Sequence, residues 1–226
     1  MIDNCDVIAK DIAIRIKPKK EILDNNYINY IITPNFKYWF VKGLVLHARP
    51  FIFILDNWFS YNEGYGIKGG NVVASLSITS NRVEWNKLGG FNFPFGDSLN
   101  ITSNFFDRGN YSIELGGEKS ISLVTITSNI FRRPIEAYLK IINSKNITIT
   151  SNSARVGRND GGGGILGPNY GFIIKECDFC IIKNNTLKEG ALKELFVLND
   201  NKDSIIEDNI GSITNESFNT GSELLN

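Results

Sequence analysis

The tetrapeptide Ile-Thr-Ser-Asn occurs four times, at residues 78–81, 101–104, 126–129 and 149–152 of a 226-residue chain. A looser form, Ile-x-x-Asn, extends the series in both directions. Its asparagines are Asn57, Asn81, Asn104, Asn129, Asn152, Asn185 and Asn209. Neighbouring asparagines are 23 to 25 residues apart, except for a step of 33 between the fifth and the sixth. Such a period is typical of repeat proteins whose units pack on one another.

Each unit has the pattern of a β-strand. In the stretch LSITSN (76–81), Leu76 and Ile78 are expected to face inward and Thr79 outward, because side chains alternate along a strand. One unit of short strands cannot bury its inner face alone, so the units must stack. The sequence therefore predicts an all-β, right-handed parallel β-helix (solenoid) of roughly nine coils, from the chain length divided by the period.

The asparagine is expected at the corner after each strand. There it would adopt a left-handed backbone and hydrogen-bond to the coils above and below. The same register places Cys180 in an inward column with Leu99 and Val124, so we interpret Cys177-x-x-Cys180 as part of the core. A zinc site would need two further ligands, and the sequence predicts no metal and no cofactor.

The repeat also suggests boundaries along the chain. Residues 1–40 are expected to form the first coils or an N-terminal cap, residues 41–211 the parallel β-helix, and residues 212–226 a polar C-terminal tail. Gly161–Gly164 lie in the one long unit, which is expected to bulge as a loop. That loop would be either a wall of a glycan site or a tolerated insertion.

The chain carries 24 basic and 24 acidic side chains. This balance argues against a nucleic-acid partner. No apolar run approaches the ~20 residues of a spanning helix, so no membrane insertion is expected, and the N-terminus lacks the layout of a signal peptide. Phe53, Leu55, Ile181 and Ile205 fall at outward positions, where a contiguous patch would mark an interface.

Residues 40–210 resemble the right-handed parallel β-helix family known as the pectin-lyase-like group. Without a signal peptide, and rich in Asn and Ile, the chain looks most like bacteriophage tail-spike or appendage proteins. This resemblance implies a homo-oligomer, usually a trimer, or a virion assembly that binds and in some cases cleaves surface polysaccharide or oligosaccharide. It also implies a location on the virion (phage tail) or outside the cell. Two alternatives are a free-standing bacterial polysaccharide hydrolase, lyase or epimerase, and a non-catalytic structural virion or adhesion component.

A candidate catalytic group lies three places after successive asparagines. Glu84 and Asp107 would stand one coil apart, roughly 5 Å, with Arg132 on the next coil. Two carboxylates at about that separation suit retaining glycoside hydrolysis. The competing interpretation is a solvated ladder of surface charges, which is common on proteins.

Glu114, Glu136 and Glu194 offer an alternative acidic set, because they lie 15, 16 and 15 residues before the next asparagine. Of these, Glu114 and Glu136 are the alternative catalytic pair.

Four residues are candidates for substrate binding: Trp85, Arg133, Tyr138 and Arg155. Trp85 follows Glu84 and would stack on a sugar ring. The calcium-binding aspartate cluster and the lyase arginine pattern of pectate lyases are not recognisable, which disfavours a calcium-dependent lyase.

Overall fold

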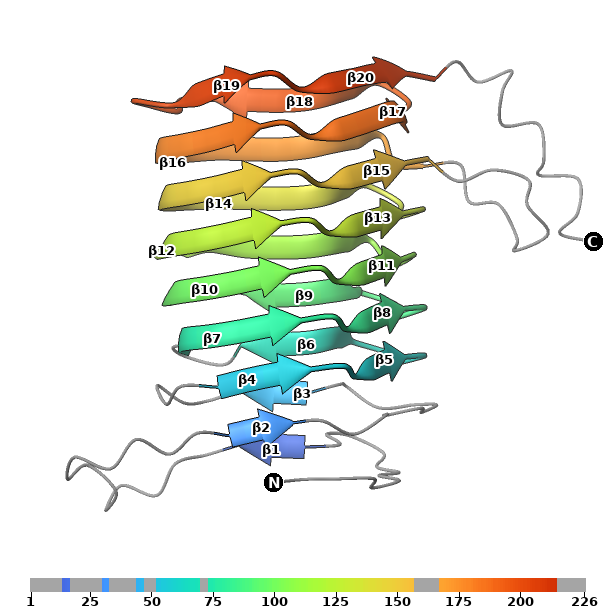
Figure 1. Cartoon of the computed structure of the whole chain (residues 1–226), viewed down its shortest axis with the longest axis vertical. Coiled ribbons are helices and arrows are strands. Elements are labelled where there is room, and N and C mark those ends of the chain that lie inside the picture. The colour runs from blue at the N-terminus through green and yellow to red at the C-terminus, as the bar shows by residue number, and fades with distance from the viewer. Residues whose placement is uncertain are drawn as a thin grey trace, which may run out of the picture.

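The computed structural model describes residues 14–16, 30–32, 44–46, 52–69, 73–156 and 167–214. These residues form 20 strands and no helix. In Figure 1 the front strands run from left to right and the strands behind them return while the chain rises, so the coil is right-handed. All strand pairs are parallel, which confirms the predicted all-β, right-handed parallel β-helix.

Each complete coil contributes to three faces of the solenoid. Face 1 consists of β1 (Ile14–Ile16), β3 (Leu44–Leu46), β6 (Tyr65–Gly69), β9 (Gly89–Phe93), the first halves of β12 (Tyr111–Thr127), β14 (Ala137–Thr150) and β16 (Tyr170–Lys183), and β18 (Glu194–Asn199). Face 2 consists of β2 (Tyr30–Ile32), β4 (Ile52–Leu55), β7 (Val73–Thr79), β10 (Gly96–Thr102), the second halves of β12, β14 and β16, and β19 (Ile205–Glu207). Face 3 consists of β5 (Trp58–Ser60), β8 (Arg82–Glu84), β11 (Phe105–Asp107), β13 (Ile130–Arg132), β15 (Ser153–Arg155), β17 (Thr186–Ala191) and β20 (Ile210–Ile213).

The described residues form fewer coils than the roughly nine predicted. Face 3 has seven strands, and faces 1 and 2 have eight each. The estimate divided the whole length by one period, although the coil between Asn152 and Asn185 takes 33 residues. Strands β1 and β2 pair in register with β3 and β4. Gly161–Gly164 and residues 215–226 lie outside the described residues, and the proposed domain boundaries stay predictions.

The isoleucine of each repeat fills the core. At this position the following residues are 0% exposed: Ile54, Ile78, Ile101, Ile126, Ile149 and Ile182. In the next inward column, Leu99, Val124 and Cys180 are 1–2% exposed, which confirms that Cys180 packs as a small hydrophobic residue. Phe106 and Phe131, from neighbouring coils of face 3, stack on each other in the core along the solenoid axis, with ring centroids 5.2 Å apart.

Each asparagine from Asn81 to Asn185 joins its coil to both neighbours. The main-chain N–H of Asn104 donates to Oδ1 of Asn129 at 2.9 Å, and its Nδ2 donates to the carbonyl oxygen of Ile78 at 2.9 Å. Its own Oδ1 accepts the N–H of Asn81 at 2.9 Å. The same N–H to Oδ1 bond recurs at every step from Asn57 to Asn209. The predicted bonding of the asparagine to the coils above and below is therefore confirmed.

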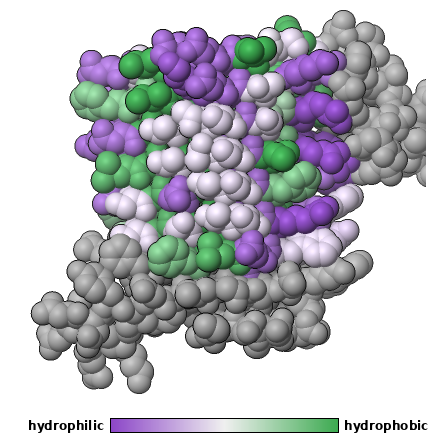
Figure 2. Space-filling view, viewed as in Figure 1, coloured by the Kyte–Doolittle hydropathy of each residue, from purple (hydrophilic) through white to green (hydrophobic). Residues whose placement is uncertain are grey.

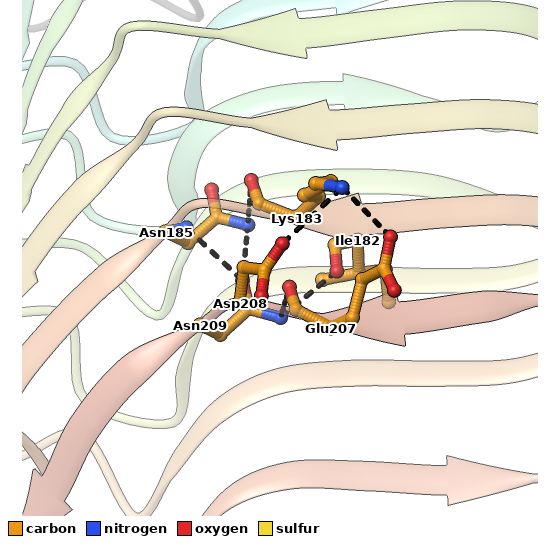
Figure 3. Close-up of polar contacts among 6 residues, drawn as sticks. All are labelled: Ile182, Lys183, Asn185, Glu207, Asp208 and Asn209. Atoms are coloured by element: carbon orange, nitrogen blue, oxygen red, sulfur yellow. Dashed lines mark hydrogen bonds and ion pairs between the residues drawn. The ribbon is translucent and has the colours of Figure 1, made fainter.

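Figure 3 shows the last step of this asparagine ladder. Nδ2 of Asn209 donates to the carbonyl oxygen of Ile182 at 2.8 Å, and its Oδ1 accepts the N–H and Nδ2 of Asn185 at 3.0 and 2.9 Å. On the outer surface beside it, Nζ of Lys183 lies 2.7 Å from a carboxylate oxygen of Glu207. At this step a surface ion pair therefore joins the same two coils as the ladder.

The left-handed corner residue is the serine, and our prediction that the asparagine adopts this conformation is wrong. Ser80, Ser103, Ser128 and Ser151 have φ values of 58, 56, 56 and 56°. All four serines are exposed at the corner. The asparagine side chain points under the turn, where its amide bonds to the neighbouring coils. The left-handed conformation is therefore adopted by the residue before the asparagine, which is the serine.

We predict that Asn104→Ala lowers the free energy of unfolding by about 2–4 kcal/mol, because it leaves the Asn81 N–H and the Ile78 carbonyl buried without these partners. Urea unfolding followed by circular dichroism measures the loss. Thr102→Ala, on the outer surface of the same coil, is the control and should change stability by less than about 0.5 kcal/mol. Equal effects of the two substitutions would contradict a stabilising role for the ladder.

Candidate functional site

The first candidate group stands in register on face 3, as predicted. Glu84 pairs with Asp107 along the stack, and Asp107 pairs with Arg132. The carboxylates do not form a solvated row, because Glu84 is only 4% exposed and Asp107 only 3%. Arg132 is half-buried and Arg155, the next residue of the column, is exposed.

Long side chains from neighbouring positions cover both carboxylates. Arg133, 6% exposed, donates through Nε to Oδ1 of Asp107 at 2.7 Å and through Nη2 to Oδ2, so the pair is bidentate. Nε of Arg82 lies 2.9 Å from Oε2 of Glu84. Each acid therefore has its own guanidinium, an arrangement that stabilises the charged form and compensates for burial.

Aromatic rings flank these ion pairs. At the corner after face 3, the rings of Tyr61 and Trp85 stack with centroids 5.6 Å apart and an interplanar angle of 15°. The guanidinium carbon of Arg108 lies 3.9 Å from the centroid of the Trp85 ring, within cation–π distance. Tyr61 is 42% exposed and Trp85 37%, so this stack, the Tyr61–Trp85–Arg108 stack, presents aromatic surface to solvent.

A second set of contacts between an arginine and aromatic rings lies on face 3, three residues earlier on each coil. The guanidinium of Arg82 lies between the rings of Trp58 and Phe105, at 5.4 and 5.3 Å from their centroids. Arg82 thus bonds to Glu84 and contacts two aromatic rings at once. These contacts hold the arginine in place over the buried carboxylate.

Glu114, the alternative candidate, is the centre of a separate cluster on face 1. Its Oε2 accepts Tyr65 Oη at 2.7 Å and Asn92 Nδ2 at 2.9 Å, and its Oε1 accepts Lys140 Nζ at 2.7 Å. The Lys140 ammonium also lies 4.8 Å from the ring centroid of Tyr111. The four partners come from three other strands and from β12 itself, so the cluster ties four coils together.

The pKa values of this cluster follow from its contacts. Burial alone would raise the pKa of Glu114, but hydrogen bonds from Lys140, Tyr65 and Asn92 outweigh it and hold the pKa below the ordinary 4.5. Burial and the bond to Glu114 raise the pKa of the Tyr65 hydroxyl. Burial acts to lower the pKa of Lys140, but its bond to Glu114 raises it overall. At neutral pH the cluster therefore holds a carboxylate, an ammonium and protonated tyrosines.

We expected Glu114, Glu136 and Glu194 to share a face; they lie on or next to strands of face 1, but not in one column. Glu114 is in register with Lys140, Glu194 with Tyr170, and Glu136 lies just before β14. Counting residues back from the asparagine does not align the three glutamates, because β12 shifts register between residues 116 and 121. The residues inserted at that corner move Glu114 along the face relative to the other two.

Tyr138 is fully buried, so it lies in the core and not on a substrate-binding surface. Its ring centroid is 5.9 Å from that of Phe131. The equivalent positions on the coils on either side are small, namely Ser112 before it and Gly171 after it. These small neighbours leave room for the tyrosine ring to turn inward.

Face 2 presents mainly hydroxyl side chains in its middle coils. Figure 2 shows a band of intermediate hydropathy there, and the outward residues include Ser77, Thr79, Asn100, Thr102, Thr125, Thr127, Thr148 and Thr150. Phe53 lies at one end of this band, and Ile181 and Ile205 lie at the other, so they form no single patch. At the later end, Leu123, Phe179, Ile181 and Ile205 line a shallow hollow of about 470 Å³.

Within the described ranges, no group of three or more His, Cys, Asp and Glu side chains is placed to hold a metal ion. No helix in the described part of the chain is long and apolar enough to span a bilayer.

Comparison with known proteins adds little to this picture. No family model matches the sequence, and no curated protein is significantly similar to it. Among solved structures, the chain is similar to the Streptococcus pneumoniae surface protein and adhesin PfbA, with 12% identity and a TM-score of 0.30. The match covers 76% of this chain and 51% of that one, so the chain spans about half the length of PfbA. At this level the similarity carries no argument about function.

The Glu114 cluster predicts a specific dependence of stability on pH. Because the folded-state pKa of Glu114 lies below 4.5, its contribution is present above that value and is lost as the pH falls through the folded-state pKa. We expect Glu114→Gln to lose less stability than the wild type between about pH 5 and pH 3. Urea midpoints at the two pH values measure this, and parallel losses in both proteins would contradict the prediction.

Proposed function

We propose that this chain is a glycan-binding β-solenoid of the phage tail-spike or appendage type, which recognises surface polysaccharide through the Tyr61–Trp85–Arg108 stack. The supporting observation is a pair of parallel aromatic rings, 42% and 37% exposed and backed by a guanidinium. Tyr61 covers one face of the Trp85 ring and Arg108 the other, so the stack offers a sugar its exposed ring edges, and such rigid rings lose little conformational entropy on binding. Arg108 and the neighbouring Arg132 supply donors for hydroxyl or acidic groups.

In this proposal the solenoid acts outside the cell or on a virion, as one chain of a homotrimer. The hollow lined by Leu123, Phe179, Ile181 and Ile205 supports an association surface on face 2, because Leu123 and Phe179 are 55% and 56% exposed. Apolar side chains grouped around a hollow favour burial against a partner. Face 2 lies away from the aromatic stack, so oligomerisation would leave the glycan site open.

Binding is favoured over catalysis because the carboxylates of face 3 are already neutralised. Asp107 is held by two bonds from Arg133, and Glu84 by Arg82, and both acids are almost fully buried. A general acid or nucleophile must reach the glycosidic bond. For the polysaccharide to be cleaved, Arg82 and Arg133 would have to move aside.

Depolymerase activity is the second candidate function, and the observation that favours it is the register of Glu84 with Asp107. Incubation with capsule and O-antigen polysaccharides, followed by a reducing-end assay, tests it. We expect no chain shortening by the wild type. Shortening that Glu84→Gln and Asp107→Asn both abolish would make the protein a hydrolase with Glu84, Asp107 and Arg132 at its centre. Shortening that persists in both variants would direct attention to Glu114 and Glu136.

We predict that Trp85→Ala weakens polysaccharide binding at least tenfold, because it removes the central ring that holds Tyr61 and Arg108 in place. Trp85→Phe should retain part of the affinity. Binding to a panel of surface polysaccharides by surface plasmon resonance measures both. Ile130→Ala, which removes an exposed apolar side chain (48%) from the same face, is the matched control and should bind normally. Normal binding by Trp85→Ala would overturn the proposed site.

A further inference from the structure

Tyrosine recurs on every second coil of face 1. Tyr65, Gly89, Tyr111, Ala137 and Tyr170 are in register along this face, so the tyrosines alternate with the two smallest side chains. With ~4.8 Å between coils, neighbouring tyrosines are ~9.6 Å apart and the three span ~19 Å along the axis. We call this row the tyrosine track.

Contacts show that the rings lean along the solenoid axis. Tyr65 reaches Glu114, two coils further on, through a 2.7 Å bond from its Oη. On the way its ring crosses Gly89, where a Cβ atom would come within 3.2 and 3.3 Å of Cε1 and Cδ1. Glycine at this position is therefore what allows the ring to lie close against the sheet.

The other two rings have comparable contacts with the coil that follows them. The ammonium of Lys140, three residues after fully buried Ala137 on the same strand, lies 4.8 Å from the Tyr111 ring centroid. The ammonium of Lys193 lies 5.8 Å from the ring centroid of Tyr170. All three tyrosines are half-buried, so each ring is held against the protein and still reaches solvent.

This spacing selects a particular shape of glycan. In an extended β-1,4-linked chain, each sugar is turned by about half a revolution relative to the last, so alternate sugars present the same face. One sugar advances by roughly one coil spacing. An aromatic ring on every second coil would therefore meet the same face of every second sugar, whereas a coiled α-1,4-linked glycan would leave the row.

Polar groups lie along the track: Asn92 on the coil between the first and second rings, Glu114 on the coil of the second ring, and Lys140 on the coil between the second and third. Glu114 and Lys140 are bonded to each other, and the ammonium of Lys140 has three donors, of which Glu114 takes one. Asn92 contributes an amide on the intervening coil. These groups can bond sugar hydroxyls without a net charge, which suits a neutral glycan.

We propose that the tyrosine track binds an extended β-1,4-linked glycan parallel to the solenoid axis, with Tyr65, Tyr111 and Tyr170 stacking on alternate sugars. The proposal rests on the proposed function only in that the chain binds glycans. It concerns face 1, a different surface from the Tyr61–Trp85–Arg108 stack, and it names the linkage and repeat of the ligand.

Isothermal titration with β-1,4-linked gluco-, manno- and N-acetylgluco-oligosaccharides of two to six sugars tests it, with maltohexaose as the α-1,4-linked comparison. We expect affinity for at least one β-linked series to increase with length up to five or six sugars, and maltohexaose to bind at least tenfold more weakly. Tyr111→Ala should reduce hexasaccharide affinity at least tenfold. Tyr111→Phe should retain most of the affinity, which guards against a folding defect.

Two results would overturn the proposal. One is the absence of binding to every β-1,4-linked series, or equal binding of maltohexaose. The other is unchanged affinity in a folded Tyr111→Ala protein. If Trp85→Ala abolishes polysaccharide binding while Tyr111→Ala does not, the tyrosine track fails and the proposed function stands. If no glycan of either panel binds, both fail.

Discussion

The buried main-chain N–H of each asparagine is the constraint on which the rest of the solenoid depends. It lies beneath the corner, away from water, and its acceptor is the side-chain Oδ1 of the asparagine on the next coil. A buried donor without a partner is costly, so neighbouring coils must meet in this one register. The columns of isoleucine, tyrosine and arginine are consequences of the same register.

The inner columns were predictable because they depend only on local period. Isoleucine three places before each asparagine is buried in every described coil except the last, where Ile206 is 38% exposed. The position of the left-handed residue was not predictable in the same way. Serine and asparagine both suit a corner, and only the need for the amide to reach the next coil assigns the turn to the serine.

The candidate site was predictable in register but not in burial. Glu84 and Asp107 align as their spacing indicates, yet their exposure depends on arginines that fold over them from other positions. Arg133 is 26 residues from Asp107 in sequence, and no period connects a side chain to what covers it. The burial of Tyr138, which we expected on a substrate-binding surface, was not predictable for a related reason. The direction of its side chain depends on the small size of Ser112 and Gly171 on adjacent coils.

The tyrosine track, by contrast, can be recognised in the sequence, although counting residues back from the asparagines hides it. The words YGIK, YSIE and YGFI begin at Tyr65, Tyr111 and Tyr170, each at the start of a face 1 strand. Because β12 carries extra residues after Gly116, the number of residues from the tyrosine to the next asparagine differs between the units. Counting back from the asparagines therefore places the three tyrosines at different positions. If the residues before and after this corner of variable length are aligned separately, the three tyrosines fall at the same position of the repeat.

The asparagine ladder is also polar, with every main-chain N–H donating toward the C-terminal side. In each of these coils the asparagine N–H therefore has its acceptor on the coil that follows in sequence. The 33-residue coil obeys the same rule, since the Asn152 N–H meets Oδ1 of Asn185 at 3.0 Å. The ladder therefore has two unlike ends: a coil added at the C-terminal side would bring an acceptor for the last asparagine N–H, whereas a coil added at the N-terminal side would bring a donor for the first Oδ1.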